Sequence, residues 1–160
     1  MKADFIIPFV EATSSICGEI TGKPPTRGEL AVRKELYTTQ PINILCGITG
    51  DVQGIAMLGL SKETAMTFAR DMLGTDVRVF DHTVGAAMIE LGNKVSHQSS
   101  AVLLSSGVRL EVTSAVLVRG MNINVPNFGA PILIIPLQFG EVGVVDVKLS
   151  ARAIAHDKAA

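Results

Sequence analysis

Aromatic and charged residues are both scarce in this chain of 160 residues. Only 4% of the residues are aromatic and none is tryptophan, so a core must be built from aliphatic side chains. Charged residues make up 18%, with fourteen basic residues against fifteen acidic ones and no basic run. This balance removes the electrostatic basis for binding nucleic acid or an anionic membrane surface, and we expect neither as a partner.

Cysteines and long hydrophobic runs are also rare. Cys17 and Cys46 are the only cysteines, and each lies in an apolar stretch, which favours buried reduced thiols over a disulfide or a metal site. The longest apolar run, residues 130–137, is too short to span a membrane. The apolar run near the N-terminus is too short for the apolar core of a signal peptide. We therefore expect a cytoplasmic protein.

The abundant residues are aliphatic. Hydrophobic residues make up 48% of the chain, and the mean hydropathy of +0.39 is high for a small monomer. We expect a second copy or a partner to cover part of the apolar surface. The length predicts one domain, residues 1–155, followed by a short C-terminal tail, residues 156–160.

Apolar spacing predicts three helices and six strands. The helices are expected at residues 4–21, 62–73 and 81–107, and their N-caps at Asp4, Ser61 and Asp81. Alternation and turn residues predict strands at residues 29–36, 42–48, 53–60, 108–119, 131–139 and 142–149. Strands joined by hairpins form antiparallel sheets. The sequence therefore predicts an α+β fold in which helices pack on one face of an antiparallel sheet of about six strands.

The helix predicted at residues 81–107 carries the polar residues of greatest chemical interest. Its apolar stripe, which we expect to be buried, consists of Val84, Met88, Leu91, Val95 and Val102. Glu90, Asn93 and His97 fall about 200° from that stripe, because a helix turns by about 100° per residue. A carboxylate and a carboxamide one turn apart can form a chemical site, and the alternative is an ordinary solvated helix face.

Other polar combinations on this helix are weaker candidates. A metal site formed by Glu90, His97 and His82 would need ligands spread over two helical turns, so we predict no metal site. Asp81 and His82 are interpreted as helix-start residues rather than an acid–base pair. Four serines have no partner that would activate a nucleophile, and we interpret them as packing residues: Ser99, Ser100, Ser105 and Ser106.

Four segments follow one another in a characteristic order: IPFVEA at residues 7–12, GITGDVQGIAMLG at 47–59, ARDMLG at 69–74 and ELGN at 90–93. In this order they resemble the opening helix, the glycine-bounded hairpin, the end of the second helix and the Glu-x-x-Asn signature of the CheX/CheC family of chemotaxis phosphatases. The opening helix carries Glu11 and Ser14 but no matching Asn. A single signature resembles the CheX branch, whose members typically form homodimers.

The resemblance implies a phosphatase that accelerates hydrolysis of the aspartyl phosphate of a CheY-like response-regulator receiver domain. Asn93 would orient the attacking water, because a carboxamide can donate and accept hydrogen bonds at once. Glu90 would contact a lysine of the receiver. The resemblance implies no cofactor in this chain, since the Mg²⁺ belongs to the receiver, and it implies a homodimer.

Three positions depart from the family pattern. Ala86 stands where many members have Asp or Ser, and His97 stands where Gly is usual, so both are candidate partner-docking positions. A Pro expected near Ser114 and Ala115 is absent. These departures leave two alternatives open: a CheX-like module that binds a receiver or another signalling partner without hydrolysing its phosphate, and a structural dimerisation domain.

Overall fold

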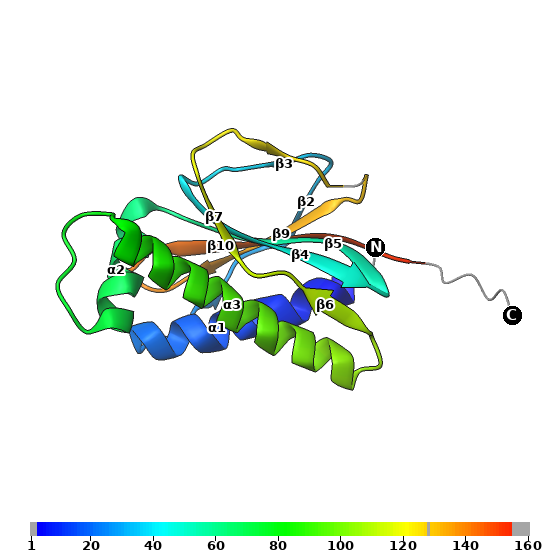
Figure 1. The fold of residues 1–160 in the computed structure, drawn as a ribbon, viewed down its shortest axis with the longest axis horizontal. Coiled ribbons are helices and arrows are strands. Elements are labelled where there is room, and N and C mark those ends of the chain that lie inside the picture. Colours follow the sequence, from blue (N-terminus) through cyan, green and yellow to red (C-terminus); the bar gives the residue numbers. More distant parts are fainter. Residues whose placement is uncertain (1–2, 128, 155–160) are drawn as a thin grey trace, which may run out of the picture.

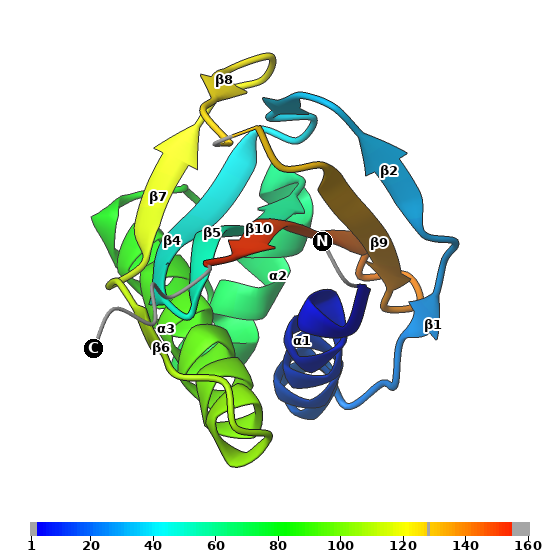
Figure 2. The same cartoon turned by 90° about the vertical axis from the view of Figure 1, so that its right-hand side faces the viewer.

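Three helices pack on one face of an antiparallel sheet in the computed structural model, which describes residues 3–127 and 129–154 (Figures 1 and 2). A short 3₁₀ turn, Ala3–Phe5, leads into α1 (Ile6–Thr21), and the other helices are α2 (Lys62–Leu73) and α3 (His82–Ser105). The strands are β1 (Thr26–Arg27), β2 (Ala31–Arg33), β3 (Leu36–Tyr37), β4 (Ile42–Gly50), β5 (Val52–Leu60), β6 (Leu110–Val112), β7 (Val116–Arg119), β8 (Asn124–Val125), β9 (Ile132–Gln138) and β10 (Val144–Ala153).

The main sheet has eight strands arranged in six rows. Its order is β1-β9-β10-β5-β4-β6, with β2 continuing the row of β1 along β9, and β7 continuing the row of β6 along β4. All its pairings are antiparallel. The predicted α+β fold, with helices on one face of the sheet, is confirmed. The strands β3 and β8 form a separate small sheet that the sequence did not indicate.

Two predicted strands are interrupted in the structure. The stretch 29–36 contributes β2 to the main sheet and Leu36 to the small sheet, and the stretch 108–119 is divided into β6 and β7. Pro136 on β9 has no N–H to donate, and its carbonyl accepts from Gly28 N at 2.8 Å in the gap between β1 and β2. The gap between β1 and β2 therefore lies opposite a proline, a residue that sheets accept at interruptions of this kind.

Of the N-caps predicted for α1 and α2, one is confirmed and the other is wrong. Ser61 caps α2 as predicted, because its Oγ accepts from Thr64 N at 3.1 Å, and Gly74 ends that helix at φ 67°. Asp4 does not cap α1. The chain enters α1 through the 3₁₀ turn, so Phe5 is the N-cap residue and no side chain makes a capping bond there.

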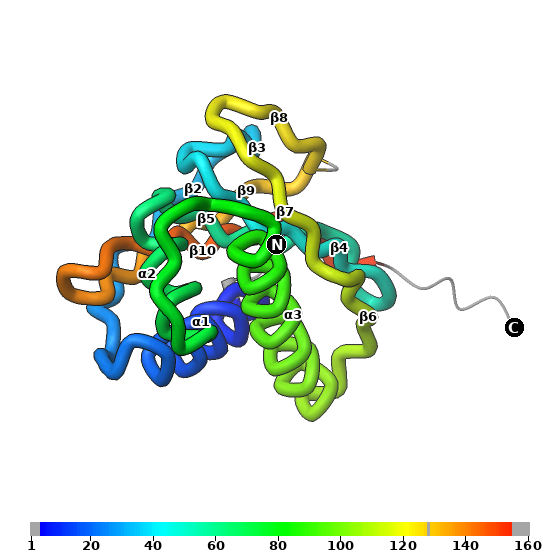
Figure 3. The backbone as a smooth tube through the Cα atoms, turned by 60° about the vertical axis from the view of Figure 1, so that its left-hand side comes forward, coloured from blue at the N-terminus to red at the C-terminus, as the bar shows by residue number. Residues whose placement is uncertain are grey.

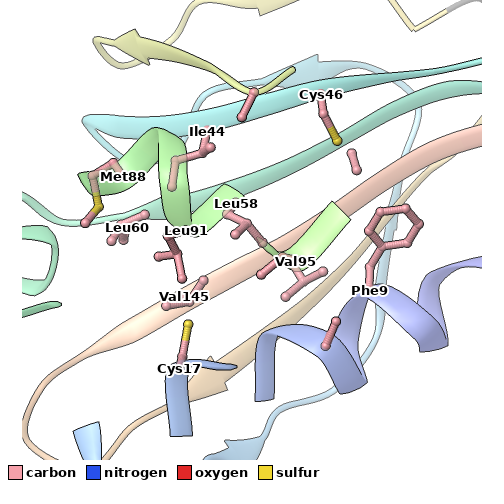
Figure 4. Packing of buried hydrophobic residues seen from close by; sticks show 14 of the residues in the cluster. Phe9, Cys17, Ile44, Cys46, Leu58, Leu60, Met88, Leu91, Val95 and Val145 are labelled. Atoms are coloured by element: carbon pink, nitrogen blue, oxygen red, sulfur yellow. The ribbon is translucent and has the colours of Figure 1, made fainter. Parts of the chain in front are cut away.

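Aliphatic side chains fill the space between the helices and the sheet (Figure 4). The alternation predicted for residues 42–48 is confirmed, since the inward residues of β4 are all buried: Ile42, Ile44, Cys46 and Ile48. They meet Leu91 and Val95 of α3 and Phe9 of α1 in one cluster. This packing fixes the orientation of α3 relative to the sheet.

The opposite face of the sheet carries polar anchors that hold the long connections. Lys148 on β10 is 2% exposed, and its Nζ donates to Thr39 Oγ1 at 2.7 Å and to the carbonyl of Tyr37 at 3.2 Å. Ser150 donates to the carbonyl of Ala130 at 3.1 Å. The predicted tail, residues 156–160, lies outside the described residues. Within the described ranges, no helix is long and apolar enough to cross a membrane.

Candidate functional site

The candidate site is built on α3, a helix of 24 residues that runs beside α1 under the sheet (Figure 3). Asp81 begins the helix, because its Oδ1 accepts from Thr83 N at 3.0 Å and from Val84 N at 3.2 Å. The interpretation of Asp81 as a helix-start residue is confirmed. This cap and the buried face together fix which side of α3 is presented outward.

The predicted buried stripe is confirmed at four of its five positions, which are Val84, Met88, Leu91 and Val95. Val102 is 41% exposed, so the prediction for that residue is wrong. Leu103 is buried in its place, because toward its C-terminal end the buried side of α3 turns to the side that faces β6. In the middle of the helix, where Glu90 and Asn93 lie, the buried side is therefore the predicted stripe.

Three of the four proposed site residues lie exposed on one face of α3. Ala86, Glu90 and His97 are all exposed, and their spacings of four and seven residues place them on the same face, one and then two turns apart. Glu90 forms an ion pair with Lys94, whose Nζ lies 3.4 Å from Glu90 Oε1. The sequence reading missed Lys94, although a Glu–Lys spacing of four is a recognisable helix signal.

Asn93 is placed differently from the expectation. It is half-buried at the margin of the exposed face, and its Oδ1 accepts from the backbone N–H of Ala115 at 2.7 Å. The expected position, fully opposite the buried stripe, is therefore wrong for this residue. The Nδ2 of Asn93 has no hydrogen-bond partner among residues 3–127 and 129–154, so its two N–H groups remain available to a ligand or to water.

Gly92, inside the Glu-x-x-Asn segment, allows α3 to approach the sheet closely. A Cβ atom at this position would collide with Cγ2 of Ile44 and would lie 3.0 Å from the Cβ of Ala115. The missing side chain thus brings the backbone of α3 within reach of the segment that contains Ala115. The hydrogen bond between Ala115 and Asn93 depends on this approach.

Buried hydroxyls on α3 are used for packing, not for chemistry. Ser96 donates to the carbonyl of Gly92 at 2.6 Å, and Ser99 donates to the carbonyl of Val95 at 2.6 Å. Ser105 and Ser106 are exposed and each donates to the carbonyl of Val102 at the end of the helix, so their interpretation as packing residues is wrong. In the part of the chain that the structure describes, no group of three or more His, Cys, Asp or Glu side chains could hold a metal ion.

Comparison with known proteins gives a sequence relative and structures of the same fold. No protein-family model matches the chain. The chain is 28% identical over 134 residues to the CheY-P phosphatase CheX of Thermotoga maritima, covering 83% of this chain and 82% of that protein.

Two solved structures have the same fold. A CheC-like superfamily protein from Shewanella sp. PV-4 matches with a TM-score of 0.84 at 19% identity, covering 96% of this chain and all (100%) of that one. The CheX of a Borrelia burgdorferi complex of CheX, CheY, BeF₃ and Mg²⁺ matches with a TM-score of 0.78 at 22% identity, covering 94% of this chain and 99% of that one.

Proposed function

We propose that the chain belongs to the CheX/CheC family of chemotaxis proteins and is a phosphatase of a phosphorylated CheY-like receiver domain. The observation that carries the proposal is the geometry of Asn93 and Glu90. One rigid helix presents both side chains, and the amide of Asn93 is held in one orientation by Ala115 N–H. A preorganised amide beside a carboxylate suits a reaction that needs a water held in place.

The proposed reaction is hydrolysis of an aspartyl phosphate. The oxygen of a water molecule forms a new bond to phosphorus, and the bond between phosphorus and the aspartate oxygen breaks with its electron pair. The products are the free aspartate carboxylate and inorganic phosphate, and the protons of the water pass to the phosphate and to solvent. The receiver supplies its own Mg²⁺ and lysine, so this chain needs to contribute positioning rather than a nucleophile or a metal of its own.

Asn93 acts in this proposal as the water-positioning residue. Its Nδ2 carries two N–H groups without a partner among the described residues. One of them can donate to the attacking water, which keeps a second lone pair directed at phosphorus. Restricting the water to an in-line position lowers the entropic part of the barrier without any covalent intermediate on this protein.

Glu90 acts in this proposal as the docking carboxylate for the receiver's lysine. Its side chain is 61% exposed, and its present partner is Lys94 on the same helix. An exposed ion pair at this helical spacing stabilises by only about 0.3–0.5 kcal/mol. The ammonium group of the receiver's lysine can therefore replace Lys94, or share Glu90 with it, at little cost in free energy. Ala86 and His97 lie on the same exposed face, one turn before Glu90 and one turn after Asn93, and would touch the receiver.

We also propose a homodimer located in the cytoplasm. Support for the dimer comes from the high mean hydropathy of +0.39 and from large apolar side chains on the surface, among them Val32, Met121 and Ile123. A single Glu-x-x-Asn segment per chain would then give two sites per dimer. Sedimentation equilibrium tests this, with an expected mass of twice the 16.9 kDa of one chain.

The test of the function is a dephosphorylation assay with a panel of receiver domains from the same organism. Each receiver is phosphorylated with a small-molecule phosphodonor, and phosphate release is followed with and without this protein. We expect faster release from at least one receiver, saturating with the concentration of this protein. A receiver that binds without faster release would favour the non-catalytic module instead, and self-association without receiver binding would favour the dimerisation domain.

A further inference from the structure

We propose that a β-bulge at residues 113–115 is the positioning element of the site, and that the N–H of Ala115 fixes the amide of Asn93 with Nδ2 toward the receiver. This inference rests on the proposed function, because it names what holds the water-positioning side chain. It concerns a backbone group 22 residues away from Asn93 in sequence. No property of the Glu-x-x-Asn segment itself points to it.

The register of the edge row identifies the bulge. Val112 of β6 lies opposite Ile48 of β4, and Val116 of β7 lies opposite Leu45. Three residues, 113–115, therefore face only two residues of β4, and one residue of the edge row is left out of the pairing. Bulges of this kind turn a backbone group out of the ladder and are common beside functional sites.

The bulge is fixed to β4 on its N-terminal side. Thr113 N donates to the carbonyl of Gly47 at 2.9 Å, and Gly47 N donates to Thr113 Oγ1 at 2.7 Å. The threonine hydroxyl thus takes the place of a backbone carbonyl in the ladder. Pairing of β7 with β4 resumes at Val116, so both ends of the bulge are anchored.

Between these anchors the N–H of Ala115 points to α3 instead of to β4, and it donates to Asn93 Oδ1 at 2.7 Å. Ala115 itself is 5% exposed, so its N–H would otherwise be a buried donor without a partner. The row of Figure 2 that contains β7 and β6 runs beside α3, which agrees with this contact.

The contact selects one of the two orientations of the Asn93 amide. The terminal torsion of asparagine is broad and nearly two-fold, so an unheld amide can present either its oxygen or its nitrogen outward. With Oδ1 on Ala115 N–H, the reversed orientation would set an NH₂ group against another N–H, which is unfavourable because both are donors. The bulge therefore keeps Nδ2 outward before any receiver binds.

The variant that tests the role of the bulge removes only the backbone N–H of Ala115. Replacing residue 115 by its α-hydroxy analogue converts the peptide bond into an ester, which removes the N–H and keeps the buried methyl group. Ser114→Pro is the matched control, because it removes the neighbouring N–H of the same bulge and leaves the N–H of Ala115 in place. Ser114 is exposed, and its own N–H has no partner within the described residues.

We expect the ester to lower kcat for receiver dephosphorylation about tenfold, because the amide loses its fixed orientation. The Kd for a receiver carrying beryllofluoride should stay within about twofold of wild type, since Glu90 and the docking face are unchanged. Ser114→Pro should keep the wild-type kcat. A general structural defect would instead raise Kd along with lowering kcat.

An NMR measurement separates the failure of this inference from the failure of the proposed function. A through-hydrogen-bond coupling is expected between the nitrogen of Ala115 and the side-chain carbonyl carbon of Asn93. Absence of that coupling, or an unchanged kcat in the ester variant of an active protein, would overturn the role of the bulge while leaving the phosphatase assignment standing. A wild-type protein that accelerates no receiver, yet shows the coupling, would overturn the assignment and with it the catalytic role of the bulge.

Discussion

At the scale of single residues, Glu90 is the side chain whose removal should weaken receiver binding with almost no change in the free energy of unfolding. It is exposed, and its partner in the structure is Lys94. Glu90→Ala should change the free energy of unfolding by less than about 0.5 kcal/mol, because exposed ion pairs of this spacing contribute little. The same change should raise the Kd for a beryllofluoride-bound receiver about tenfold, because a charge-assisted contact is lost.

Glu11 on α1 provides the matched control for this prediction. It is also an exposed glutamate, and Ser14 rather than Asn follows it three positions later. Glu11→Ala should leave the Kd unchanged in the same titration. Equal weakening by both substitutions would mean that the receiver is attracted by general negative charge rather than by Glu90.

Lys148 is the residue whose environment gives stability a pH dependence. Burial lowers the pKa of its ammonium group from the usual 10.5, and the nearby carboxylate of Asp146 partly opposes that shift. Between the lowered pKa and 10.5 the unfolded chain holds a proton that the folded chain has released. The free energy of unfolding contributed by Lys148 therefore increases as the pH rises through this window.

Lys148→Met should remove this pH dependence. In urea titrations from pH 7 toward pH 10.5, the stability of wild type relative to Lys148→Met should rise with pH. Lys62→Met, which changes an exposed lysine at the start of α2, should follow wild type across the same range. A constant difference between wild type and Lys148→Met at every pH would contradict the proposed effect of burial.

At the scale of elements, the contact of α3 with β4 determines whether the site can form. Gly92→Ala should lower the free energy of unfolding by about 1–3 kcal/mol, because its Cβ collides with Ile44 and crowds Ala115. Gly18→Ala is the matched control inside α1, where an added Cβ makes only an ordinary contact, 3.5 Å from the carbonyl oxygen of Lys23. That substitution should be neutral or stabilising by up to about 1 kcal/mol, because alanine favours helix. Equal effects in chemical denaturation would show that the close approach is not what makes Gly92 necessary.

Local signals in the sequence predicted the elements, and contacts distant in sequence decided where two edge rows of the sheet are interrupted. Ser61 and Asp81 cap their helices as predicted, because a cap needs only residues within the first turn. The gap between β1 and β2 at residues 28–30 and the gap between β6 and β7 at residues 113–115 arise from register against β9 and β4, far along the chain. No periodicity within residues 108–119 reveals which of them is left unpaired.

In the candidate site, too, local signals were predictable from the sequence and contacts between distant segments were not. The spacing of Glu90 and Asn93 on one helix was predictable from sequence, and so was the ion-pair spacing to Lys94. The orientation of Asn93 was not predictable, because it depends on Ala115 and on the close approach at Gly92. A helical projection therefore placed Asn93 in solvent, whereas the fold places it half-buried.

At the scale of the whole molecule, the two thiols report on the integrity of the core. Cys17 and Cys46 are buried and unpaired among aliphatic side chains, as predicted (Figure 4). Burial raises the pKa of the Cys17 thiol to about 12, and burial also raises the pKa of Cys46. Reactive thiolate is therefore scarce at both positions in the folded protein.

Neither cysteine should react with a disulfide reagent within minutes at pH 8, and both should react at once in guanidinium chloride. The reaction is followed by the absorbance of the released thiolate. Gly92→Ala should label faster than wild type, since a less stable core opens more often. Rapid labelling of one thiol in native wild-type protein would contradict the packing around that residue.

The central claim is that Asn93 provides the acceleration, and the most direct measurement is the first-order rate of phosphate loss from a cognate receiver at saturating protein. Asn93→Ala should reduce the acceleration about 100-fold, because the water is no longer held in line. It should lower the free energy of unfolding by about 1–3 kcal/mol, because the buried N–H of Ala115 loses its acceptor. Gln98→Ala, which removes an exposed carboxamide from another side of α3, should keep the wild-type rate. Wild-type acceleration by Asn93→Ala would contradict the account.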